Sequence, residues 1–99
     1  MEAETITLYR AVSPSEYHQL SKSGQFQYLG GAEGKYFAEY EAHAREWGHV
    51  LFGKEHYQIV RVEIPKHVAD QFHRFPLLDG IGPARFARMD QLEIYDLTV

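Results

Sequence analysis

Residues 34–47 read Gly-Lys-Tyr-Phe-Ala-Glu-Tyr-Glu-Ala-His-Ala-Arg-Glu-Trp. They predict a glycine turn, a short aromatic strand over residues 35–38 and then an amphipathic helix. The helix is indicated by side chains that recur at i, i+4, i+7 and i+11, namely Tyr40, Ala44, Trp47 and Leu51. Because Tyr36 on the strand and Trp47 on the helix lean toward one corner, and Ala44 leaves room there, this corner can hold a flat ligand. Judged by spacing alone, burial in an ordinary core is the more frequent role of such aromatic side chains.

The same segment resembles, without a gap, the nicotinamide-binding signature of the ADP-ribosyltransferase fold as it occurs in the poly(ADP-ribose) polymerases. That signature is Gly-x-Tyr-Phe-Ala, an acidic residue, and a helix that carries a small residue and, three positions later, an aromatic one. The matching residues here are Gly34, Tyr36, Phe37, Ala38, Glu39, Ala44 and Trp47. The resemblance implies that Tyr36 and Trp47 sandwich the nicotinamide ring of NAD. Trp47 replaces a tyrosine of the family, and Ala44 replaces a serine that hydrogen-bonds the carboxamide.

Length and composition limit the classes of protein that this chain can belong to. Ninety-nine residues with 44% hydrophobic content predict one small globular domain over residues 1–99. No apolar run approaches the roughly 20 residues of a membrane-spanning helix, and residues 1–5 lack the features of a signal peptide. The absence of cysteine excludes disulfides and thiolate metal sites. A net charge of −4 argues against a broad phosphate-binding surface, so a nucleic-acid partner would have to be held locally.

Residues 5–11 alternate in character and predict a strand whose apolar face, Ile6 and Leu8, ends at Arg10. A guanidinium at that position needs a carboxylate, carbonyl groups or a bound phosphate, because an unpaired buried charge is costly. From the residues alone, a structural ion pair and a ligand-binding role are equally open. The resemblance implies the second, because the first strand of this fold carries the NAD-anchoring residue, which is an arginine in the toxin-like branch and a histidine in the polymerase-like branch.

The segments between these motifs predict further elements. Residues 13–16, Ser-Pro-Ser-Glu, predict a capping box at the start of a helix with Tyr17 and Leu20 facing inward. Residues 25–33 predict a loop at the rim of the cleft. A strand is predicted over residues 57–64, with Val60, Val62 and Ile64 on its core face, followed by a short helix over residues 66–72. Residues 75–89 show no period and predict a long loop, which either recognises a partner or packs on the sheet edge.

Residues 91–99 predict a last strand on which Gln91 and Glu93 point the same way. Residues 91–93, Gln-Leu-Glu, resemble the Gln-x-Glu motif of bacterial toxin transferases, in which the glutamate holds the nicotinamide ribose hydroxyl and the glutamine helps to select the target. In a second register, residues 94–96 resemble the Val-Tyr-Asp segment of the polymerase-like branch, and Gln91 then takes the place of the catalytic glutamate. We favour Glu93, since an arginine first strand accompanies the Gln-x-Glu motif. From the residues alone, a solvent-facing glutamate on an edge strand is expected.

The chemistry of the family explains why these residue types would be needed. Cleavage of the bond between nicotinamide and ribose develops positive charge on the ribose, which a nearby carboxylate stabilises while an arginine holds the pyrophosphate. The catalytic residues implied by the resemblance are Glu93, Gln91 and Arg10. The NAD-binding residues implied are Arg10, Ala11, Gly34, Tyr36, Phe37, Ala44 and Trp47. NAD is the substrate and no metal is required; the spacing of the six histidines also does not predict a zinc site.

The resemblance implies an α+β fold of ADP-ribosyltransferase type, with two small, bent antiparallel sheets around an NAD cleft and helices on the outside. A domain of 99 residues resembles the toxin tips at the C-terminal ends of large secreted polymorphic bacterial proteins, including those of Rhs type. The implied function is mono-ADP-ribosyl transfer to a macromolecule, protein or RNA, such as part of the translation machinery.

Further expectations follow from the same resemblance. The toxin would be delivered as part of a larger protein, would act as a monomer in the target-cell cytoplasm without a membrane partner, and would be neutralised by an immunity protein in the producer. Two alternatives remain open. One is an NAD glycohydrolase toxin with water as the acceptor, and the other is a catalytically inactive binding module that kept the fold and lost the acid.

Overall fold

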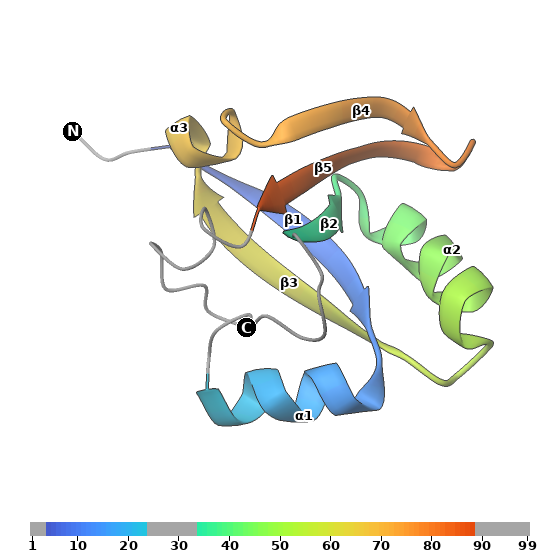
Figure 1. Ribbon diagram of the computed structural model, residues 1–99. Helices are drawn as coiled ribbons and strands as arrows, with labels where there is room; N and C mark the ends of the chain where they lie inside the picture. Colours follow the sequence, from blue (N-terminus) through green and yellow to red (C-terminus); the bar gives the residue numbers. More distant parts are fainter. Residues whose placement is uncertain (1–3, 24–33, 89–99) are drawn as a thin grey trace.

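The computed structural model describes residues 4–23 and 34–88. Five strands and three helices form within these ranges (Figure 1), in the order β1 (Thr5–Val12), α1 (Pro14–Ser23), β2 (Gly34–Ala38), α2 (Glu41–Phe52), β3 (Gln58–Pro65), α3 (Lys66–Ala69), β4 (His73–Leu78) and β5 (Gly82–Arg88). The predicted α+β class is confirmed. None of these helices is both long and apolar enough to cross a membrane. The loop predicted over residues 25–33 and the strand predicted over residues 91–99 lie outside the described residues.

The five described strands form one antiparallel sheet in the order β3-β1-β2-β5-β4. Strand β1 is in register with β3 over eight residue pairs, and β2 is in register with β5 over five. Between these two blocks, the described register consists of the single pair Tyr9↔Ala38. In Figure 1, β1 and β3 accordingly cross the molecule together, while β5 and β4 run together at an angle to them. A wedge therefore opens where β1 and β2 diverge.

Two separate sheets were expected, but the described strands form a single sheet. The physical reason lies in β2, which is five residues long and hydrogen-bonds on both edges. Its pairing with β1 at Ala38 joins two blocks that otherwise separate. The sheet is thus continuous but nearly divided.

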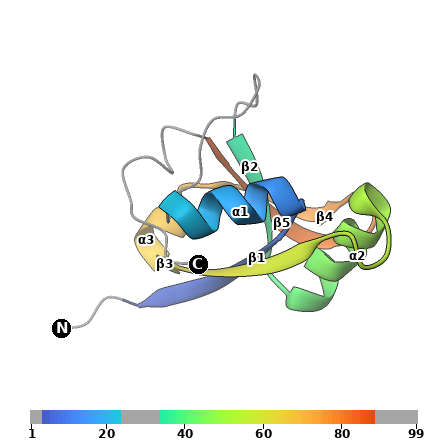
Figure 2. The ribbon, with the colours of Figure 1, turned by 90° about the horizontal axis from the view of Figure 1, so that it is seen from below.

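The core lies between the sheet and helices α1 and α3. It contains Leu8, Val12, Leu20, Phe37, Val60, Val62, Ile64, Val68, Ala69, Phe72 and Ala87. The predicted core face of β3 is therefore confirmed, as is the inward orientation of Leu20. Tyr17 was also predicted to face inward, which is wrong, since it is 40% exposed. Figure 2 shows α1 lying across β1 and β3, with α2 and α3 near opposite ends of the sheet.

The prediction of a loop over residues 75–89 is wrong, because β4 and β5 form a hairpin there. Its strands are connected by Asp79, Gly80 and Ile81, and the φ values of Asp79 and Gly80 are 56° and 72°. The Ile81 N–H donates to the Leu78 carbonyl at 3.0 Å. An Asp-Gly pair between apolar residues is a strong hairpin signal, but the prolines of the segment concealed it. The proline of β4 is tolerated because β4 lies at the edge of the described sheet.

Candidate functional site

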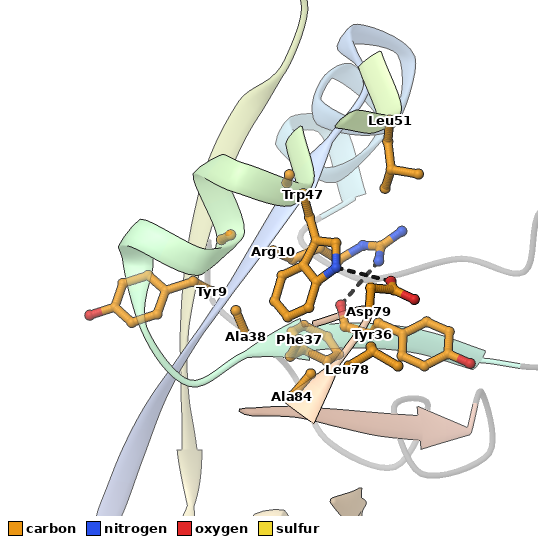
Figure 3. A pocket seen from close by; sticks show the side chains of 12 residues that line it. Tyr9, Arg10, Tyr36, Phe37, Ala38, Trp47, Leu51, Leu78, Asp79 and Ala84 are labelled. Carbon is orange, nitrogen blue, oxygen red and sulfur yellow. Dashed lines mark hydrogen bonds between the residues drawn. The ribbon is translucent and has the colours of Figure 1, made fainter. Parts of the chain in front are cut away.

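A pocket of about 80 Å³ lies in the wedge between β1 and β2, beside helix α2 (Figure 3). Sites for drug-sized ligands measure about 300–1,000 Å³, so this one accommodates a single ring while the rest of a ligand lies outside. Six of the seven residues expected to bind NAD line the pocket, and Gly34 does not. The complete lining consists of Tyr9, Arg10, Ala11, Tyr36, Phe37, Ala38, Ala44, Trp47, Leu51, Leu78, Asp79 and Ala84.

Small residues let the elements around the pocket approach one another closely. On α2, Ala44 is 1% exposed, and a Cβ atom on Gly48, one turn later, would collide with the ring of Tyr57. On β2, a Cβ atom on Gly34 would meet the carbonyl oxygen of Ala87. Gly34 therefore serves the close pairing of β2 with β5, and the small face of α2 brings the neighbouring tryptophan to the pocket.

Arg10 bridges the two diverging strands. Its Nη1 donates to the Tyr36 carbonyl at 3.1 Å, and its Nε and Nη2 donate to the two carboxylate oxygens of Glu16 at 2.8 and 3.0 Å. These contacts provide the carboxylate and carbonyl partners that a structural arginine needs. Arg10 also lines the pocket, so its structural role and a ligand-binding role are compatible.

Two charged residues behind Arg10 were not anticipated as part of the site. Glu16, which is 8% exposed, is predicted from the sequence only as part of the capping box of α1, and its N–H does donate to Ser13 Oγ at 3.2 Å. Lys35, 5% exposed, places its Nζ 3.7 Å from Glu16 Oε1. Burial lowers the pKa of Lys35, and the Glu16 carboxylate opposes that effect. One available signal was the alternation of β2, which turns Lys35 to the same face as the buried Phe37.

Trp47 is oriented by the tip of the β4–β5 hairpin. Its Nε1 donates to Asp79 Oδ2 at 3.1 Å, and both side chains line the pocket (Figure 3). Asp79 is not among the site residues that the sequence predicts, because residues 75–89 are predicted as an irregular loop. The Asp-Gly hairpin signal was the feature that could have placed it at a fixed position.

Tyr36 lies at the outer side of the pocket. Its ring is packed on Phe86, with ring centroids 4.8 Å apart and an interplanar angle of 51°, and the residue is 47% exposed. In Figure 3 the Tyr36 ring extends away from the Trp47 indole, with Leu78 and Asp79 between them in this view. The two rings thus border one pocket, but they do not stand parallel on either side of a space for a ligand ring. A sandwiched ligand would require the Tyr36 side chain to turn toward the indole.

The acidic residue of the motif, Glu39, has a structural role. It accepts hydrogen bonds from Arg74 Nε at 2.7 Å and from Arg85 Nε at 2.9 Å, and Arg85 Nη1 also donates to the Ala69 carbonyl at 3.0 Å. The hydrogen bond from Arg74 is the main cause that lowers the pKa of Glu39. Glu39 thereby fastens both strands of the hairpin to the end of β2, and it does not line the pocket.

The remaining expected site residues, Gln91 and Glu93, lie outside the described residues. Within residues 4–23 and 34–88, no group of three acidic or histidine side chains is arranged to hold a metal ion. The chemistry that the described pocket offers is therefore an indole face, a paired guanidinium and one carboxylate around a ring-sized space.

Compared with known proteins, the chain matches no family model, and no curated protein or solved structure shows significant similarity to it.

Proposed function

We propose that this chain is an ADP-ribosyltransferase-type domain that binds NAD, releases nicotinamide and transfers ADP-ribose to a macromolecule, protein or RNA. One observation carries the proposal. Arg10, Tyr36 and Trp47 come from β1, β2 and α2, and all three line one pocket. The two blocks of the nearly divided sheet then correspond to the two sheets expected of that fold, with the pocket in the wedge between them.

The shape and apolar lining of the pocket suit the nicotinamide ring. The Trp47 indole offers a stacking surface that orients the leaving group, and Ala44 leaves the space beside it open. The ribose and the phosphates would lie outside, because the pocket of about 80 Å³ holds only one ring.

The charges near Arg10 suit the pyrophosphate. A guanidinium has five N–H donors. Among the described residues, Glu16 and the Tyr36 carbonyl use three of those of Arg10, and the other two could bind a phosphate. Two cations, Arg10 and Lys35, share the single carboxylate of Glu16. The cluster therefore keeps a net positive charge that would attract an anion.

In this proposal Glu93 stabilises the positive charge that develops on the ribose, and Gln91 helps to select the acceptor. The domain would be the toxin part of a larger bacterial protein, such as a polymorphic toxin of Rhs type. It would act as a monomer in the cytoplasm of a target cell, and an immunity protein would protect the producer.

The test incubates the purified chain with NAD labelled in its adenosine part, with and without a bacterial lysate. Transfer of label to a protein or RNA band, together with nicotinamide release that depends on the lysate, is the expected result. Equal nicotinamide release without lysate would instead identify an NAD glycohydrolase. NAD binding without either reaction would identify an inactive binding module, and the absence of NAD binding would refute the proposal.

A further inference from the structure

Two of the twelve residues that line the pocket are charged, Arg10 and Asp79. The charge of Arg10 is paired, because Glu16 accepts two of its hydrogen bonds. Asp79 accepts a hydrogen bond from the indole N–H of Trp47, which is a neutral donor. In the part of the chain that the structure describes, Asp79 thus brings an unneutralised negative charge to the indole edge.

The position of Asp79 is held by contacts on both sides of the hairpin turn. The turn closes through the hydrogen bond from Ile81 N–H to the Leu78 carbonyl. A Cβ atom on Gly82 would collide with the ring of His43 on α2, so the hairpin and the helix are in close contact at that point. The Asp79 carboxylate is therefore presented to the pocket by docked elements.

A ring that enters this pocket meets an aromatic face and a carboxylate together. An indole face attracts cations through its quadrupole, and the attraction grows where water is excluded. A carboxylate adds direct Coulomb attraction. Both groups distinguish a cationic ring from a neutral ring of the same shape.

We infer that Asp79 is a specificity-determining residue that makes the pocket prefer the cationic nicotinamide ring of NAD⁺ over the uncharged dihydronicotinamide ring of NADH. This inference rests on the proposed function, because it assumes that the ring bound here is that of a nicotinamide dinucleotide. The charges around the pocket match such a ligand. The negative charge of Asp79 would face the cationic ring, and Arg10, which shares the Glu16 carboxylate with Lys35, would face the phosphates.

The test compares the affinities of the chain for NAD⁺ and NADH by calorimetry in low salt. For the wild type we expect NAD⁺ to bind about tenfold more tightly, which corresponds to about 1.4 kcal/mol. Asp79→Asn keeps an oxygen that can accept from the indole N–H but removes the charge. The ratio of the two affinities should then fall close to one through weaker NAD⁺ binding. The chain has one tryptophan. The fluorescence of Trp47 in Asp79→Asn without ligand therefore also reports whether the environment of the indole is retained.

Glu46→Gln is the matched control, because it removes the same charge from an exposed position next to Trp47 that does not line the pocket. It should keep the wild-type ratio. The wild-type preference should also shrink in high salt, since Asp79 is exposed and screening weakens the attraction between exposed charges. A preference that does not change with salt would overturn the role of charge.

The outcomes separate this inference from the function on which it rests. If the wild type binds NAD⁺ and Asp79→Asn leaves the ratio unchanged, the role of Asp79 is refuted and NAD binding stands. If the wild type binds neither dinucleotide, both the proposed function and the role of Asp79 are refuted.

Discussion

Three acidic side chains near the pocket have three different roles, which their partners determine. Glu16 is bound by Arg10 and Lys35, and Glu39 is bound by two arginines of the hairpin. Asp79 accepts from an indole. Because ion pairs occupy the first two carboxylates, the third is the one whose charge can act on a ligand within the described pocket.

At the residue scale, Trp47→Ala should weaken NAD binding by roughly tenfold or more, since a stacked aromatic pair contributes about 0.5–1.5 kcal/mol beyond its buried area. Calorimetry would measure the affinity. Val50→Ala is the control, because Val50 is on the same helix, is 75% exposed and does not line the pocket. Equal affinities of wild type and Trp47→Ala would remove the stacking role.

A second residue-scale prediction concerns the acid of the last segment. Glu93→Ala should abolish the transfer of ADP-ribose and leave the circular dichroism spectrum unchanged, because the lost carboxylate would have stabilised the charge on the ribose. Gln91→Ala should lower transfer and retain nicotinamide release. The reverse pattern, with Gln91 essential and Glu93 dispensable, would favour the polymerase-like register.

At the scale of elements, helix α2 and the β4–β5 hairpin are fastened to each other around the pocket. The indole of Trp47 reaches Asp79 at the hairpin turn, and Gly82 packs against the ring of His43. The Glu39 N–H donates to the Pro83 carbonyl at 3.3 Å just before α2 begins. The pocket is thus bounded by elements whose contacting residues are 32 to 44 positions apart in the sequence, and its shape depends on their close approach.

Gly48→Ala tests a second close contact of α2, its packing on Tyr57, which directly precedes β3. Alanine improves helix propensity by about 1 kcal/mol, but here its Cβ atom would lie 2.5 Å from a ring atom of Tyr57. We expect a net loss of about 1–3 kcal/mol, as for overpacked cores, measured by urea unfolding. A variant with a higher free energy of unfolding than the wild type would contradict this prediction, because it would show that the Tyr57 ring moves away from α2 without a loss of stability.

At the scale of the whole molecule, the backbone joins the two blocks of the described sheet, β3-β1 and β2-β5-β4, at one point. Backbone register contributes the single pair Tyr9↔Ala38 within the described sheet. Arg10 spans the wedge from β1 to the Tyr36 carbonyl of β2, and Glu39 ties the end of β2 to the hairpin. Arg10 therefore joins the two blocks, and Glu39 holds β2 to the hairpin within one of them.

This arrangement predicts a dependence of stability on pH. The pKa of Glu39 is lowered in the folded state by Arg74 and Arg85, so the folded state binds fewer protons than the unfolded state in acid. The stabilisation is complete above the ordinary carboxyl pKa and is lost as the pH falls from there through the lowered pKa. Glu39→Gln should reduce the free energy of unfolding at pH 7 by about 1.5–3 kcal/mol, as for hydrogen bonds to charged groups.

Urea unfolding at pH 7 and at pH 3 would measure both effects. The wild type should lose more stability between the two pH values than Glu39→Gln does, and Glu41→Gln, at an exposed position of α2, should resemble the wild type. An unchanged pH dependence in Glu39→Gln would contradict the structural role of Glu39.

Local patterns in the sequence predicted the strands and helices of residues 5–69 and hence the α+β class, whereas the family resemblance nominated the six pocket residues. Alternation and helical spacing depend on neighbours along the chain, so they can be read from it. Only the tertiary structure decided that Glu16 pairs with Arg10, that Glu39 holds the hairpin and that Asp79 meets Trp47. These contacts join residues that are 6 to 46 positions apart, and the choice among several possible charge partners follows from packing, which no local pattern specifies.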